Sequence, residues 1–280
     1  MTNAIRVAWL STALLPRAVA SAGDSSVGIW LVWGVWLLVA IAVLVPHPLA
    51  LVMVRLGTPM LVLNGVAVLV HDSNPRWGAF LGPAIMLGVG VVGFTASYGA
   101  IHAQAAAYGH ERRHLLRPPV AVIAPLTLLW MANLILAATA IFADRLPVSM
   151  AAATLLVALG AFTLRRAMVL ARRWLVFVPA GIAVHDPLFL RDTFMVRTHD
   201  VRALRAVDRS SVASNDSTDE AFDATGTTWG SPLELVLSHP HDVSLSSFGA
   251  RLSRTLDRLH VKSVLVAPSR PRAALADAAR

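Results

Sequence analysis

The clearest candidate for chemistry in this sequence is the run His110-Glu111-Arg112-Arg113-His114, which has the pattern H-E-x-x-H. On a helix, residues four apart share one face, so the two imidazoles could hold one zinc ion while the Glu111 carboxylate polarises its water. The two arginines favour a different interpretation, in which the run is a basic helix lying against anionic lipid headgroups. This second interpretation predicts no catalytic residue and no bound metal at the motif.

The motif resembles that of integral-membrane zinc metallopeptidases, in which H-E-x-x-H follows a transmembrane helix on the cytoplasmic side. The resemblance implies a catalytic Glu111, with zinc held by His110 and His114. Those families usually have uncharged residues between the histidines and take a third ligand, often a glutamate, from a later helix. Here both intervening residues are arginines, and the only later glutamates are Glu220 and Glu234. The basic-helix interpretation is therefore preferred.

Four His-Asp dipeptides, which begin at His71, His185, His199 and His241, offer further metal-ligating side chains. Adjacent side chains on a strand point to opposite faces, so such a dipeptide does not chelate an ion by itself. We expect these residues to occupy turns or the polar ends of strands. The sequence contains no cysteine, which excludes disulfides and thiolate metal sites.

Long apolar stretches dominate the first part of the chain, and few charges interrupt them. Of all residues, 56% are hydrophobic and 14% are charged, against about 25% charged in soluble domains. A helix of ~20 apolar residues crosses a hydrocarbon core of roughly 30 Å. The sequence therefore predicts a membrane α-helical bundle over residues 28–170, with about five transmembrane helices. The predicted spans are Gly28–Pro46, Leu49–His71, Ala79–Ile101, Val120–Ala143 and Val148–Leu170.

Arginines gather on one side of this predicted bundle. Arg112, Arg113 and Arg117 follow the third span, and Arg165 and Arg166 lie at the exit of the fifth. The positive-inside rule places both regions in the cytoplasm, where the arginines are expected to meet the membrane surface. The net charge of +8 then reflects topology, so the lipid bilayer is the expected partner and nucleic acid is not.

Two finer features of the membrane region carry predictions. Residues 1–27 combine an apolar run with Arg17 and the A-x-A pattern Ala20-Ser21-Ala22. This pattern predicts either an amphipathic segment on the membrane surface or a cleaved signal peptide. Asn64 and Asn133 lie in the middle of their spans, where interhelical hydrogen bonds are the expected role of a polar side chain.

Residues 171–280 are expected to form a small soluble α+β domain of mainly antiparallel strands. Trp174–Val178 and Gly181–His185 flank a Pro-Ala-Gly turn and predict a β-hairpin. A second hairpin is predicted around Pro240, from 233–237 and 242–245, followed by a helix over 248–259. The polar stretch Asp208–Ser231 is predicted to be a mobile loop.

The run from Arg173 to Ile182 resembles the opening of bacterial PH-like domains that follow transmembrane helices, where a first hairpin comes directly after the last span. The whole chain resembles integral membrane proteins of unknown function from high-GC bacteria. A bias toward arginine and alanine, with Lys262 as the only lysine, agrees with this origin. The resemblance implies a multi-pass protein of the bacterial cell membrane.

The leading functional hypothesis is a non-enzymatic membrane protein whose cytoplasmic domain binds lipid headgroups or another membrane or cytoplasmic protein. No cofactor is expected under this hypothesis. One alternative is a membrane-embedded zinc metallohydrolase that uses the H-E-x-x-H motif. A second alternative is an accessory subunit of a transport system.

Overall fold

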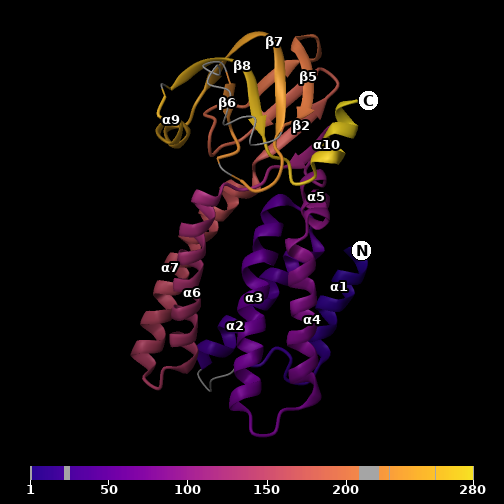
Figure 1. Cartoon of the computed structure of the whole chain (residues 1–280). Helices are drawn as coiled ribbons and strands as arrows, with labels where there is room; N and C mark the ends of the chain where they lie inside the picture. Colours follow the sequence, from indigo (N-terminus) through magenta and orange to yellow (C-terminus); the bar gives the residue numbers. More distant parts are fainter. Residues whose placement is uncertain (1, 22–25, 208–220, 227, 256, 280) are drawn as a thin grey trace. The chain divides into compact units, whose positions relative to one another are not determined.

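The structure, a computed structural model, describes residues 2–21, 26–207, 221–226, 228–255 and 257–279. The chain divides into two compact units (Figure 1). The helical unit comprises Met1–His102 and Leu126–Met168, and the strand unit comprises Ala103–Pro125 and Val169–Arg280. The strand unit therefore includes residues from the loop after the third predicted span, as well as the tail that the sequence assigned to it.

Five helices in the described residues are long and apolar enough to cross a membrane. Four of them match the predicted spans to within a few residues at each end, which confirms the apolar stretches as helices. In these four, the helix ends lie close to the Pro, Asp or Arg residues that bound the apolar runs. The five helices are α2 (Ser26–Leu44), α3 (Pro48–His71), α4 (Trp77–Phe94), α6 (Val120–Phe142) and α7 (Leu146–Ala171).

The third predicted span, Ala79–Ile101, is wrong in its extent, because the helix breaks at Thr95. Helix α4 ends at Phe94, and a separate helix, α5, runs over Ala96–Gln104. Thr95 is extended (ψ 147°), and its hydroxyl accepts a hydrogen bond from the Tyr98 amide at 3.2 Å, as an N-cap residue does. Arg55 of α3 donates from Nε to the Gly93 carbonyl at 3.0 Å, which satisfies one of the orphan acceptors at the end of α4.

Small residues let α3 and α4 approach closely. A Cβ atom on Gly65 would lie 2.2 Å from the Pro83 ring, and one on Gly90 would lie 2.9 Å from the Thr58 hydroxyl. Gly88, Gly90 and Gly93 together read G-x-G-x-x-G, but they lie inside α4 and not in a turn between a strand and a helix. Gly90 and Gly93 face α3, whereas Gly88 is exposed, so the run does not form a dinucleotide-binding loop.

The N-terminal residues pack within the helical unit. Helix α1 (Thr2–Ser11) buries Trp9, whose ring stacks on Trp36 of α2 with a centroid distance of 6.3 Å. Asn64 donates to the carbonyl of Ala20 at 2.7 Å, so one of its partners lies in the segment that follows α1. Asn133 of α6 donates to Thr163 of α7 at 2.9 Å, which confirms the predicted interhelical hydrogen bond.

The strand unit contains two four-stranded sheets (Figure 1). The first is an antiparallel meander in the order β1-β2-β3-β4, and the second has the order β5-β7-β8-β6. Apolar side chains from both sheets form one buried core, which includes Leu175, Val196 and Leu235. The strands are β1 (Arg112–Leu115), β2 (Trp174–Val178), β3 (Gly181–His185), β4 (Phe194–Arg197), β5 (Val201–Ala206), β6 (Ala221–Asp223), β7 (Leu233–Ser244) and β8 (Arg258–Val266).

The predicted hairpin of β2 and β3 is confirmed, but three other predictions for this unit are wrong. The hairpin around Pro240 is instead one long strand, β7, whose pairing with β8 shifts register between Val236 and His241. The helix predicted over 248–259 is the shorter α9 (Ser247–Ser253). Residues 221–223 of the predicted loop form β6, parallel to β8, while 208–220 lie outside the described residues. Helix α10 (Pro271–Ala278) closes the chain.

Candidate metal centre

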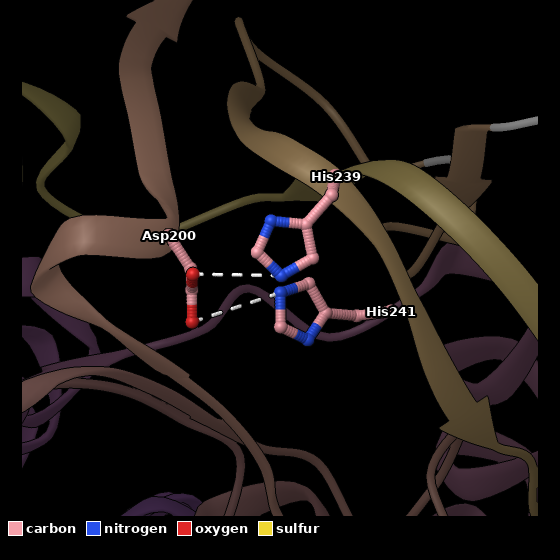
Figure 2. Close-up of side chains that lie close together, drawn as sticks. All are labelled: Asp200, His239 and His241. Carbon is pink, nitrogen blue, oxygen red and sulfur yellow. Dashed lines mark ion pairs between the residues drawn. The ribbon is translucent and has the colours of Figure 1, made fainter.

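The strongest cluster of ligating side chains in the described part of the chain consists of Asp200, His239 and His241. One ligand atom from each lies within 4.8 Å of the other two. Figure 2 shows the imidazole rings of both histidines directed at the carboxylate of Asp200. All three residues belong to the strand unit, and we call them the His–Asp cluster.

Asp200 is positioned by the crossover between the two sheets. Strand β4 ends the first sheet at Arg197, a 3-10 turn (η2, Thr198–Asp200) follows, and β5 then begins the second sheet. The Asp200 side chain is only 13% exposed, although it carries a carboxylate. The next residue, Val201, pairs with Leu237 of β7, so the crossover delivers Asp200 to the residues that follow Leu237.

The two histidines come from the irregular middle of β7. Pro240 has no amide hydrogen to give to a sheet ladder, which explains why the register of β7 and β8 shifts in this segment. Residues two apart on a strand point to the same face, and His239 and His241 are two apart. Their rings are stacked, with centroids 4.6 Å apart and an interplanar angle of 27°.

The distances within the His–Asp cluster are longer than hydrogen bonds. His239 Nε2 lies 3.5 Å from Asp200 Oδ1, and His241 Nε2 lies 3.9 Å from Asp200 Oδ2. N–H···O hydrogen bonds have donor–acceptor distances of about 2.7–3.2 Å. His199, which is exposed, places its Nε2 atom 3.5 Å from Asp200 Oδ1 and adds a third imidazole near the same carboxylate.

His241 carries the most informative single atom. Its Nε2 is buried and has no hydrogen-bond partner, while its ring packs edge-on against Phe194 at 6.4 Å. Leaving a buried polar atom unsatisfied costs about 1–3 kcal/mol. Two imidazole nitrogens and one carboxylate are a donor set that holds zinc and similar divalent ions in proteins.

The H-E-x-x-H motif does not form the helix on which its zinc interpretation depends. Glu111 precedes β1, and His114 lies within that strand, so the helical i/i+4 argument and the predicted basic helix are both wrong. His114 Nε2 lies 3.0 Å from Asp277 Oδ2 in α10, and Arg113 donates to Glu111 at 2.7 Å. The hydrogen bond from Arg113 lowers the pKa of Glu111, and burial lowers the pKa of His114.

The arginines assigned to the membrane surface have varied contacts. Arg112 forms an ion pair with Asp277, Arg113 lies over the Trp174 ring, and Arg117 donates to the carbonyl of Trp229. These three residues therefore stabilise the strand unit. Arg165 and Arg166 lie near the end of α7 and are both exposed. His110 is exposed as well and lies in the turn before β1.

The His-Asp dipeptides have different structural roles. Asp186 forms a buried ion pair with Arg173, and Asp72 forms an ion pair with Arg17. Asp200 and His241, which come from two different dipeptides, join one cluster with His239, which the sequence analysis did not single out. The signal that could have found His239 is the His-Pro-His spacing, since two residues is the repeat of one strand face.

Comparison with known proteins gives no further guidance on this site, since no protein-family model, curated protein or solved structure matches the chain.

Proposed function

We propose that this chain is a non-enzymatic, multi-pass protein of the bacterial cell membrane whose strand unit is a binding module at the cytoplasmic face. Lipid headgroups are the ligands that the exposed basic residues favour, and a protein partner is the alternative that the test below distinguishes. The concentration of arginine at the junction of helices and strands supports the cytoplasmic placement.

The observation that supports the proposal is that short chain segments link the strands of the strand unit to the ends of the long helices. Residues 105–111 lead from α5 into β1, residues 116–119 lead from β1 to α6, and residues 172–173 lead from α7 to β2. An extended residue covers at most about 3.6 Å, so the last link holds the start of β2 within roughly 11 Å of the end of α7. A module with such short links stays beside any membrane that these helices cross.

Exposed arginines near these links suit anionic headgroups. Arg165 and Arg166 in α7 and Arg172 just after it are exposed. Each basic residue near an anionic membrane surface contributes about 1 kcal/mol of attraction. The metallohydrolase alternative has less support, because the Glu111 carboxylate is paired with Arg113. No observation favours the transport-subunit alternative over the others.

The test is hydrogen exchange of the full chain in nanodiscs of neutral lipid and of lipid with an anionic fraction. We expect anionic lipid to protect the strand unit, and we expect Arg165→Gln, Arg166→Gln and Arg172→Gln, combined, to abolish that protection. The matched control combines Arg251→Gln, Arg258→Gln and Arg272→Gln, which remove three exposed charges from α9, β8 and α10. Equal protection in both lipids would remove headgroups as the ligand and leave a protein partner.

A further inference from the structure

We propose that the His–Asp cluster is a metal site, in which His239, His241 and Asp200 bind one divalent ion of the zinc class. The inference is independent of the proposed lipid binding, because the two involve different residues. The metal site uses imidazole nitrogens and a carboxylate, whereas lipid binding uses exposed guanidinium groups.

The spacing of the ligand atoms fits a bound ion after small adjustments. Zinc takes imidazole nitrogen and carboxylate oxygen at about 2.0–2.2 Å, so two ligand atoms of a tetrahedral site lie about 3.3–3.6 Å apart. His239 Nε2 lies 3.5 Å from Asp200 Oδ1, within that range, and His241 Nε2 lies 3.9 Å from Asp200 Oδ2, slightly beyond it. The His239 side chain is 56% exposed and has room to adjust its rotamer.

Ordinary hydrogen bonding does not explain the arrangement. The separations of 3.5 and 3.9 Å exceed hydrogen-bond lengths, and the buried Nε2 atom of His241 has no partner. Two stacked imidazoles also aim their Nε2 atoms at one carboxylate (Figure 2). A cation bound between the three side chains would accept a lone pair from each of them.

The donor set points to a particular class of ion. Imidazole nitrogen suits zinc, copper, nickel and iron, whereas magnesium and calcium prefer sites made of oxygen alone. The chain has no cysteine, so a site rich in sulfur cannot compete for the ion. With three protein ligands, the fourth position is left to water, and the visible spectrum of a cobalt-loaded protein would report the geometry.

A bound ion would tie two parts of the strand unit. Asp200 lies in η2, where the chain leaves the first sheet for the second, and the histidines lie at the register shift of β7. Joining them fixes the crossover to the longest strand of the second sheet. We therefore expect metal to protect the crossover amides from hydrogen exchange.

The test uses the full chain in detergent, purified through an affinity tag without histidine and stripped by a chelator. Zinc is then titrated in competition with a chromophoric chelator, and bound metal is counted by mass spectrometry. We expect about one zinc per chain. His239→Ala removes an exposed ligand with little risk to folding, and we expect it to weaken zinc binding at least 100-fold, since even an outer-shell change costs about 10–100-fold.

The matched control is His260→Ala, which removes an exposed histidine of β8 whose ring is paired with Asp242. Its zinc affinity should equal that of the unmodified chain. Two results would overturn the proposal. One is a chain that binds no zinc above the level of the His239→Ala variant. The other is zinc binding that His114→Ala abolishes and His239→Ala leaves intact, which would return the site to the H-E-x-x-H motif.

Discussion

Removing the carboxylate of Asp186 should strongly destabilise the strand unit. Asp186 and Arg173 form an ion pair whose side chains are 0% and 1% exposed. Arg173 donates from Nε at 2.8 Å and from a terminal nitrogen at 2.7 Å to the two carboxylate oxygens. The same guanidinium also donates to the carbonyls of Arg117 and Ala224, at 2.7 and 3.1 Å.

The size of the effect follows from these contacts. Asp186→Ala leaves a buried guanidinium without its anion, which costs about 3–5 kcal/mol. Arg173→Met leaves a buried carboxylate without its cation, and we expect a similar loss. Combining Arg173→Met with Asp186→Leu removes both charges but still deprives the carbonyls of Arg117 and Ala224 of donors and the Leu188 amide of its acceptor, at about 1–3 kcal/mol each. The double variant should therefore lose less than the sum of the two single variants.

The assay is thermal unfolding of the full chain in detergent, with limited proteolysis read only at peptides of the strand unit. For a domain of this size, 3–5 kcal/mol corresponds to a fall in the unfolding midpoint of roughly 10–20 °C. The helical unit provides an internal reference that should not move. Losses that simply add in the double variant, or a fall of only a degree or two for Asp186→Ala, would refute the reasoning.

Three further predictions can be tested with the same material. Gly65→Ala should lower the unfolding midpoint of the helical unit, because its Cβ would lie 2.2 Å from the Pro83 ring. Gly88→Ala should leave the midpoint unchanged, because nothing lies within 4 Å of its Cβ, and equal effects of the two variants would contradict the packing. Burial lowers the pKa of His114 below its usual 6.5, so its contribution to stability is present above that value and is lost as the pH falls through the lowered pKa. Unfolding midpoints between pH 7 and pH 5 should therefore fall less steeply for His114→Asn, and parallel curves would count against this. Reporter fusions in the loop between α3 and α4 and at the C-terminus should report opposite sides of the membrane, and matching signals would rule out the topology.

Hydropathy was sufficient to predict most of the helical unit, since four spans follow directly from uninterrupted apolar runs. It could not predict the break at Thr95, because a helix cap depends on one side-chain hydrogen bond and leaves mean hydropathy unchanged. The β2–β3 hairpin was predictable because its turn residues are adjacent in sequence. Strand β1 could not be predicted, because it forms by pairing with β2, where Arg112 lies opposite Phe177. The residues of the H-E-x-x-H run carry no local signal of a partner so distant in sequence.

Pro240 shows how a correct local signal gave a wrong structure. Proline commonly marks a turn, so the sequence predicted a hairpin, but it also occupies irregular positions within strands. The predicted hairpin also prevented the recognition of the His–Asp cluster. A turn at Pro240 would have separated His239 from the strand face that it shares with His241. Asp200 could be added only from the tertiary structure, since the sheet crossover brings it to β7.

The strand unit contains two polar clusters that differ in whether their buried atoms have partners. The buried pair of Arg173 and Asp186 is complete in itself: four hydrogen bonds from the guanidinium satisfy it, and it needs no added group. The His–Asp cluster is built from comparable side chains, yet its distances are too long for hydrogen bonds and the buried Nε2 of His241 has no partner. The same unit that satisfies a fully buried arginine leaves this nitrogen facing a carboxylate. A bound cation accounts for both the spacing and the unsatisfied atom, whereas a role in folding alone accounts for neither.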